Sequence, residues 1–195
     1  MTTPNIDNKK SALLVMDFQA GIIGMLPNSE GLLTQAVNAI SIARKQGIQV
    51  GHVRVAFEDS DYAAIPNTNK AFSAVAGSRR MQNDSPDSAF HKNVAPQAGD
   101  IVVRKTRFGA FSTTDLDKQL RERGITNLIL AGISTSGVVL STVRDAADRD
   151  YQLYVLADAT ADPDPEVHDV LIKKVLSKQA YVITTAEFAD LISAA

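Results

Sequence analysis

The strongest constraint on the fold is an alternation of short apolar runs with longer segments of helical periodicity. The first run, residues 11–17, is apolar from its second residue until it closes on Asp17, as in a parallel strand that is buried on both faces. Over residues 29–46 the apolar side chains recur at helical spacing, and Gly47 follows at the place of a helix C-cap. Strands that alternate with helices of this length favour βαβ units and a parallel sheet.

The same alternation continues along the chain. Candidate strands span residues 11–17, 48–55, 101–104, 125–133, 151–157 and 180–184, and candidate helices span residues 29–46, 113–123, 136–149, 166–176 and 186–192. The right-handed crossover rule then predicts an α/β fold with a doubly wound, mostly parallel six-stranded sheet and helices on both faces. At 195 residues the chain fits one domain, residues 1–195.

One long segment, residues 56–99, interrupts this pattern. It is rich in Pro, Asn, Ser and Asp and has no clear periodicity. Segments this long in compact domains are usually functional lids or contain short helices of their own.

Composition excludes several classes of function. The formal net charge is -2 and no run of like charges offers a phosphate-binding surface, so nucleic acid is not an expected partner. The chain contains no cysteine, which excludes disulfides, thiolate metal sites and thiol nucleophiles. The first apolar run is too short for a signal peptide or a membrane span, so we expect no membrane contact and a cytoplasmic location.

Ligands of doubly wound sheets bind outside the carboxyl ends of the strands. Four segments are expected to meet there: Asp17 with Gln19, Lys105 with Arg107, the turn at residues 132–137, and Asp158. Asp17 and Lys105 at two strand ends can form a buried ion pair, or the carboxyl can act as an acid or a base. The alternative is that each is a strand-end charge that faces water.

The turn at residues 132–137 connects a strand with a helix, so its backbone N–H groups can bind an anion or a developing oxyanion. Ser134, Thr135 and Ser136 are all good N-cap residues, and capping is favoured over nucleophilic attack for each hydroxyl. The spacing pairs no histidine base with them.

Three blocks of the chain carry a family resemblance. LVMDFQ at residues 14–19, VRKTRFGAF at residues 103–111, and LAGISTSGVVLST at residues 130–142 resemble, in order, the three blocks of the isochorismatase-like hydrolase superfamily. The resemblance implies a Rossmann-like, three-layer α/β/α fold and a homo-oligomer, a dimer or a tetramer. It also implies a catalytic site with an Asp and a Lys, here Asp17 and Lys105.

In the amidohydrolase branch of this superfamily, a cysteine nucleophile stands at the start of the helix after the glycine-containing turn. Matching Gly132 and Thr142 to the family pattern places Val138 at that position, and an aliphatic side chain forms no acyl-enzyme. Isochorismatases proper also lack this cysteine and hydrolyse a vinyl ether by protonating it from the Asp. The resemblance therefore implies that Asp17 is the general acid and Lys105 its electrostatic partner.

The same resemblance suggests the residues that surround a small-molecule substrate. We expect Gln19, Arg107, Ile133, Ser134, Ser136 and Gly137 to bind it. Isochorismate carries two carboxylates, so arginines near the strand ends are candidates to contact it. Arg79 and Arg80 are also near, although a solvated surface role is favoured for both.

The three histidines do not suggest a metal site, and we expect no metal and no cofactor. Nicotinamidases of the superfamily hold a metal with an Asp and two histidines after the second strand. Here His52 lies inside that strand, and residues 54–70 contain no histidine. His91 is expected to be a hydrogen-bonded loop residue and His168 an exposed helix residue.

These observations leave two functions of different classes open. One is hydrolysis of a small polar, carboxylated metabolite by acid–base chemistry at Asp17 and Lys105. The other is a catalytically silent family member that binds a small molecule or a partner in the same crevice. Nucleophilic attack by Ser134 or Ser136 is a weaker third possibility.

Overall fold

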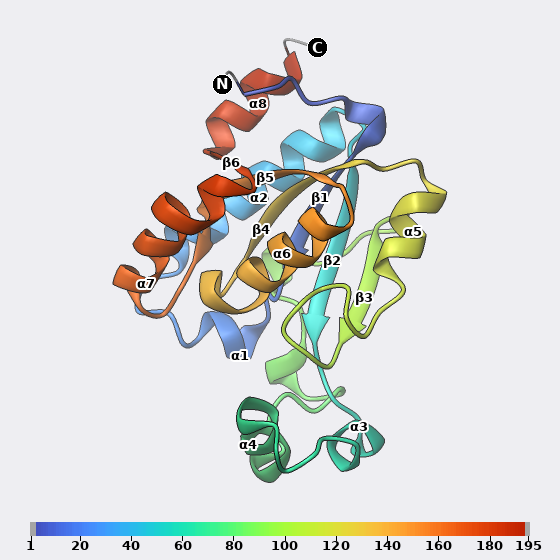
Figure 1. Cartoon of the computed structure of the whole chain (residues 1–195), viewed down its shortest axis with the longest axis vertical. Helices are drawn as coiled ribbons and strands as arrows, with labels where there is room; N and C mark the ends of the chain where they lie inside the picture. The colour runs from blue at the N-terminus through green and yellow to red at the C-terminus, as the bar shows by residue number, and fades with distance from the viewer. Residues whose placement is uncertain (1–2, 194–195) are drawn as a thin grey trace.

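The sheet of this protein is doubly wound, as the sequence predicts. The computed structural model describes residues 3–193, in which six strands pair in the order β3-β2-β1-β4-β5-β6, and every pair is parallel (Figure 1). The strands are β1 (Ser11–Met16), β2 (Gln49–Val55), β3 (Ile101–Lys105), β4 (Asn127–Ile133), β5 (Gln152–Ala161) and β6 (Tyr181–Ile183). The strand order reverses between β1 and β4, so their carboxyl ends mark the topological switch point.

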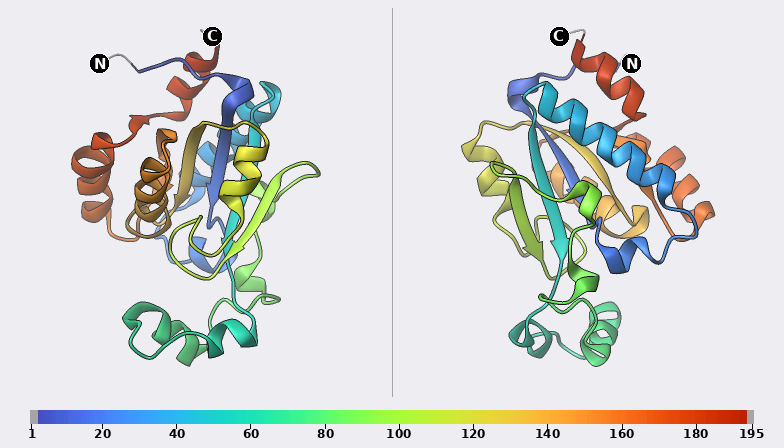
Figure 2. Two further views of the ribbon diagram at one scale, coloured as in Figure 1. Left: turned by 45° about the vertical axis from the view of Figure 1, so that its right-hand side comes forward. Right: turned by 180° about the vertical axis from the view of Figure 1, so that it is seen from behind.

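Helices cover both faces of the sheet and complete a three-layer fold (Figure 2). One face carries α2 (Glu30–Lys45) and α8 (Thr185–Ser193). The other face carries α5 (Leu116–Glu122), α6 (Leu140–Asp148) and the helical segment that begins with α7 (Pro165–Val170) and continues through η5 (Leu171–Val175) and η6 (Leu176–Lys178). The predicted three-layer α/β/α architecture is confirmed.

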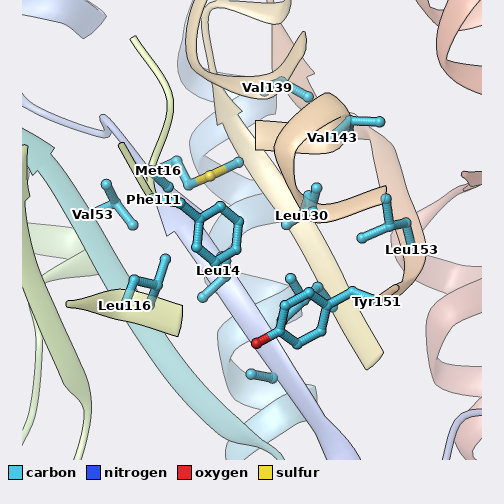
Figure 3. Close-up of a cluster of buried hydrophobic side chains, with 14 of the residues drawn as sticks. Leu14, Met16, Val53, Phe111, Leu116, Leu130, Val139, Val143, Tyr151 and Leu153 are labelled. Atoms are coloured by element: carbon cyan, nitrogen blue, oxygen red, sulfur yellow. The ribbon is translucent and has the colours of Figure 1, made fainter. Parts of the chain in front are cut away.

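The two cores follow from the period-two alternation of the central strands. In β1, Leu13 and Val15 pack under α2, whereas Leu14 and Met16 join the cluster on the opposite face. Figure 3 shows this second cluster, in which side chains of the sheet meet those of α6 and of the segments around α5. Because β1 is buried on both faces, every one of its residues is buried.

Residues 56–99 form an excursion that extends beyond the carboxyl ends of the strands (Figures 1 and 2). The excursion contains α3 (Asp59–Ala63), α4 (Lys70–Ser78), η2 (Pro86–Ser88) and η3 (Lys92–Val94), which confirms the expectation of short helices. Its buried side chains form a small cluster of their own, Phe57, Tyr62, Ile65 and Phe72.

Several boundaries differ from the expected ones. β5 continues to Ala161, and the helix expected at residues 136–149 begins as a π-helical turn, η4 (Thr135–Val139). Two short helical segments, η1 (Asn8–Lys10) and α1 (Ala20–Ile23), have no signal in the sequence pattern. Within residues 3–193 no helix is both long and apolar enough to cross a membrane.

Candidate active site

Asp17 and Lys105 form a buried ion pair at the carboxyl edge of the sheet. Asp17 directly follows β1 and Lys105 is the last residue of β3, and the Lys105 Nζ lies 2.8 Å from the Asp17 Oδ2. The two side chains are only 2% and 6% exposed, for Lys105 and Asp17 respectively. The Nζ also donates to the carbonyl oxygen of Arg107 at 3.2 Å, which fixes the lysine from its own strand end.

The backbone turns sharply at Asp17. Its φ of 60° lies in the left-handed region, which non-glycine residues rarely adopt, and asparagine and aspartate tolerate it best. The Gln19 N–H donates to the Asp17 carbonyl oxygen at 2.8 Å and closes this turn. The chain thus leaves β1 abruptly, directly beside the switch point.

Burial has the largest effect on the pKa of Asp17. Removal from water raises the pKa of its carboxyl above the ordinary value, while the charge and hydrogen bond of Lys105 and the nearby Val55 N–H lower it by less. The Val55 N–H is itself donated to Gln19 Oε1 at 2.8 Å, and Asp17 Oδ1 is buried without a hydrogen-bond partner in the described structure. The arrangement favours a carboxyl that keeps its proton to higher pH than an exposed aspartate.

A cavity of about 260 Å³ opens beside this pair. Of the residues expected at the site, the cavity is lined by Asp17, Lys105, Arg107, Ile133, Ser134, Gly137 and Val138. The other lining residues are Ile22, Met25, Val55, Phe57, Phe72, Val75, Arg80, Met81, Phe108 and Pro163. The structure therefore brings the strand ends and the excursion around one space, and Gln19 and Ser136 do not line it.

The turn after β4 forms one wall of the cavity. Ser134 follows a cis peptide bond and caps η4, because its Oγ accepts from the Gly137 N–H at 3.1 Å. The Ser136 N–H donates to Asp162 Oδ2 at 2.8 Å, away from the cavity lining. Val138 is buried, lines the cavity and belongs to the hydrophobic cluster around β1 and β4.

At Gly132 the strand β4 lies close to both η4 and β1. A Cβ added there would lie 2.9 Å from Val139 Cγ2 and 3.2 Å from the Met16 carbonyl oxygen. Only glycine fits between the strand and the turn without displacing one of them.

Gln19 holds the excursion to the sheet. Its Nε2 donates to the carbonyl oxygens of Val55 at 2.9 Å and Ser88 at 2.7 Å, and its Oε1 accepts from the Val55 N–H. All three polar contacts of this buried amide therefore go to the backbone. A glutamine three residues after a buried strand is a signal for such a role, because a buried amide must be satisfied.

Asp158 does not belong to the crevice, and the expectation that it ends a strand is wrong. It lies inside β5, which continues to Ala161, and its Oδ1 accepts from the N–H and the hydroxyl of Thr185, both at 2.9 Å. Asp158 therefore supports the beginning of α8.

The histidines are all engaged in local contacts. His52 Nε2 lies 3.1 Å from Asp100 Oδ2, and His91 accepts from the Asn93 N–H at 3.4 Å, as expected for a loop residue. His168 is not the exposed residue that we expected: it is half-buried, burial lowers its pKa, and its Nδ1 lies 2.7 Å from Thr135 Oγ1. Among residues 3–193 no group of three or more His, Cys, Asp or Glu side chains is placed to hold a metal ion.

The two neighbouring arginines of the excursion have different surroundings. Arg79 is exposed and pairs with Asp59. Arg80 is exposed as well, but its side chain also lines the cavity. The solvated surface role favoured from the sequence therefore describes only part of its surroundings.

Known proteins resemble this chain in sequence and in fold. The sequence pattern of the Isochorismatase domain matches residues 11–187. This chain belongs to the isochorismatase family. The matched range contains the two strand ends with Asp17 and Lys105 and the turn before Val138.

Relatives of this isochorismatase-family protein cover almost its whole length. The uncharacterized isochorismatase family protein YwoC of Bacillus subtilis is 35% identical over 190 residues, which cover 97% of this chain and 98% of that protein. The ureidoacrylate amidohydrolase RutB of Agrobacterium fabrum is 29% identical over 95% of this chain and 91% of its own. A solved structure of an isochorismatase family protein from Burkholderia thailandensis superposes with a TM-score of 0.82 at 27% identity, over 98% of this chain and 100% of that one.

Proposed function

We propose that this protein hydrolyses a small carboxylated metabolite by acid–base chemistry, with Asp17 as the general acid and Lys105 as its electrostatic partner. The observation that carries the proposal is the asymmetry of the Asp17 carboxyl. Asp17 lines the cavity; its Oδ2 is held by Lys105 at 2.8 Å, while its buried Oδ1 has no hydrogen-bond partner among residues 3–193. A general acid needs this combination, because the proton must be held near neutral pH and still reach the substrate.

With a vinyl ether as the substrate, the proposed reaction begins with proton transfer from Asp17. The proton on Asp17 Oδ1 moves to the terminal vinyl carbon, and the ether carbon becomes an oxocarbenium ion. Water adds to that carbon and returns a proton to Asp17. The resulting hemiketal then breaks into an alcohol and a ketone. While Asp17 is ionised, the Lys105 ammonium at 2.8 Å stabilises the carboxylate.

The site lacks the parts of a covalent mechanism. The position of the family cysteine is filled by Val138, and the chain contains no cysteine. The Ser134 hydroxyl lines the cavity but caps η4, and no histidine contacts it among the described residues. Thr135 has a histidine partner, yet it is fully buried and does not line the cavity. RutB is named as an amidohydrolase, and we propose that this chain, with no cysteine, forms no acyl-enzyme.

A second candidate function is ligand binding without catalysis. It is favoured by Val138, because a site without a nucleophile that still has a cavity can serve as a binding site. The two candidates differ in whether Asp17 is needed for turnover or only for shape and charge.

The experiment compares wild-type protein with Asp17→Asn, and uses Asp169→Asn as the matched control. Asp169 is an exposed carboxylate that pairs with Lys173, outside the cavity. We expect isochorismate turnover in wild-type and Asp169→Asn protein and a loss of at least about 100-fold in Asp17→Asn, within the range of general acid catalysis. Intact-protein mass spectrometry with a panel of amides should show no acyl adduct.

The outcomes separate the two candidates. Turnover that survives in Asp17→Asn removes Asp17 as the acid. An absence of turnover with every substrate, together with ligand binding, supports the silent family member. An acyl adduct on the wild-type protein contradicts both.

A further inference from the structure

The cavity beside Asp17 is mostly hydrocarbon. Apart from the charged side chains and Ser134, its lining side chains are apolar, and three of them, Phe57, Phe72 and Phe108, are aromatic. The aromatic rings lie close together: the centroids of Phe72 and Phe108 are 4.8 Å apart, and those of Phe57 and Phe72 are 6.2 Å apart. A wall of this kind favours the apolar surface of a ligand over hydroxyl or amide groups, which would lose water without gaining partners.

Most of this wall comes from the excursion rather than from the sheet. Phe57, Phe72, Val75 and Met81 belong to residues 56–99, and the cluster of the excursion includes or packs against all four. Phe108, from the segment after β3, closes the wall and is about half exposed. The aromatic wall is therefore a feature of this chain's own excursion, separate from the strand ends that carry the charged pair.

The charges around the cavity are unbalanced. In the described part of the chain, three positive side chains line it, Arg80, Lys105 and Arg107, against the single carboxyl of Asp17. Lys105 is already paired with Asp17, and Arg107 lies 5.3 Å from the Phe72 ring centroid, over the aromatic wall. Arg80 has no acidic partner within 4.0 Å among the described residues. An anionic group on the ligand would balance this excess.

The volume of the cavity limits the size of the ligand that it can hold. A cavity of about 150 Å³ lined by aliphatic and aromatic side chains is large enough for benzene, so about 260 Å³ holds a six-membered ring with one or two substituents.

We propose that the cavity selects a ring-sized hydrophobic molecule with one carboxylate, the ring against Phe72 and Phe108 and the carboxylate toward Arg80. Linear polar carboxylates of similar size bind weakly. The inference concerns the same site as the proposed function and names its ligand class. It adds to the metabolite expected from the sequence a ring whose apolar surface contacts the aromatic wall.

Isothermal titration calorimetry with three probes tests the ligand class. Benzoate has both features, benzamide has the ring without the charge, and 3-ureidopropionate has the charge on a linear polar body. We expect benzoate to bind at least about tenfold more tightly than either of the others, and its affinity to fall as salt is raised. Equal or tighter binding of 3-ureidopropionate would overturn the ring preference.

Two pairs of variants locate the contacts. Arg80→Gln should weaken benzoate about tenfold and leave benzamide unchanged, whereas the control Arg79→Gln, at the arginine that pairs with Asp59, should change neither. Phe108→Ala should weaken both ring ligands about three- to tenfold. Its control is Val170→Ala, another exposed apolar residue, which lies outside the cavity. Unchanged benzoate affinity in Arg80→Gln refutes the position of the carboxylate, and unchanged affinity in Phe108→Ala refutes the aromatic contact.

Binding and turnover separate this inference from the proposed function. A protein that binds benzoate as described and turns nothing over supports the ligand class and removes the catalytic proposal. A protein whose turnover depends on Asp17 but whose binding prefers 3-ureidopropionate supports the catalytic proposal and removes the ligand class.

Discussion

Replacing Lys105 with methionine tests the buried pair most directly. Methionine fills a similar unbranched volume, so the substitution removes the ammonium group while leaving little empty space. The Asp17 carboxyl then has neither its cation at 2.8 Å nor its hydrogen bond, and it stays 6% exposed. The cost of that substitution is the cost of an unpaired carboxyl in a nearly dry site.

The magnitude follows from the geometry. Two unit charges 2.8 Å apart attract each other by about 6 kcal/mol at an effective dielectric constant near 20. Asp17 can avoid part of this loss by binding a proton, so we expect Lys105→Met to lower the free energy of unfolding by about 3–5 kcal/mol at pH 8.

The loss should depend on pH with a definite sign. Burial already raises the pKa of Asp17, and removing Lys105 removes the largest effect that lowers it. A carboxyl whose pKa is raised by folding stabilises the protein below its ordinary pKa and loses that contribution as pH rises through the raised pKa. The deficit of Lys105→Met should therefore be smaller at pH 5 than at pH 8.

Urea denaturation of wild type, Lys105→Met, Asp17→Asn and the double variant measures this coupling by linear extrapolation. Each single variant leaves one buried polar or charged group without its partner, while the double variant leaves no net charge. We expect the double variant to lose clearly less than the sum of the two single losses. A Lys105→Met deficit below about 0.5 kcal/mol at pH 8, or additive losses, would refute the buried pair.

Three further predictions concern the same region. If Asp17 is the general acid, kcat/KM for isochorismate stays level at low pH and falls as pH rises through the raised pKa of Asp17, and a rise over that range in a pH–rate profile would contradict the role. Gly132→Ala should lower the free energy of unfolding by about 1–3 kcal/mol, because its Cβ would lie 2.9 Å from Val139 Cγ2; chemical denaturation that finds no change would show that the turn can move. Thr135→Val should cost about 1 kcal/mol through loss of the 2.7 Å contact with His168, measured by thermal unfolding, with Thr135→Ser retaining most of it.

The sequence brings Asp17 and Lys105 to one edge of the sheet by topology alone, because all parallel strands end there, although β2 separates β1 from β3. That the two side chains pair at 2.8 Å instead of facing water, the alternative that the sequence leaves open, depends on packing that only the structure shows. The same rule fails for Asp158, because it depends on where a strand ends. The apolar pattern of β5 does not reveal that the strand continues to Ala161, past a register shift in its pairing with β4.

Contacts between distant segments are harder to predict. The half-buried position of His168 depends on the packing of α7 against η4, and neither segment shows this in its own periodicity. The aromatic wall has the same origin. Phe57 and Phe72 lie in a stretch without a repeating pattern, and they reach the cavity only because Gln19 and the small cluster of the excursion fix its position.

The ligand class and the acid chemistry reinforce each other through the protonation of Asp17. The pKa of this carboxyl is raised chiefly because water is excluded, and the apolar side chains of the excursion line the same cavity. A hydrophobic ring that displaces the remaining water would raise the pKa further. A carboxylate held in the same space acts in the same direction, because a second negative charge disfavours ionisation of the first. A carboxylate ligand bound in the cavity therefore favours the protonated form of Asp17. The proposed reaction requires this form, because the chain has no thiol nucleophile.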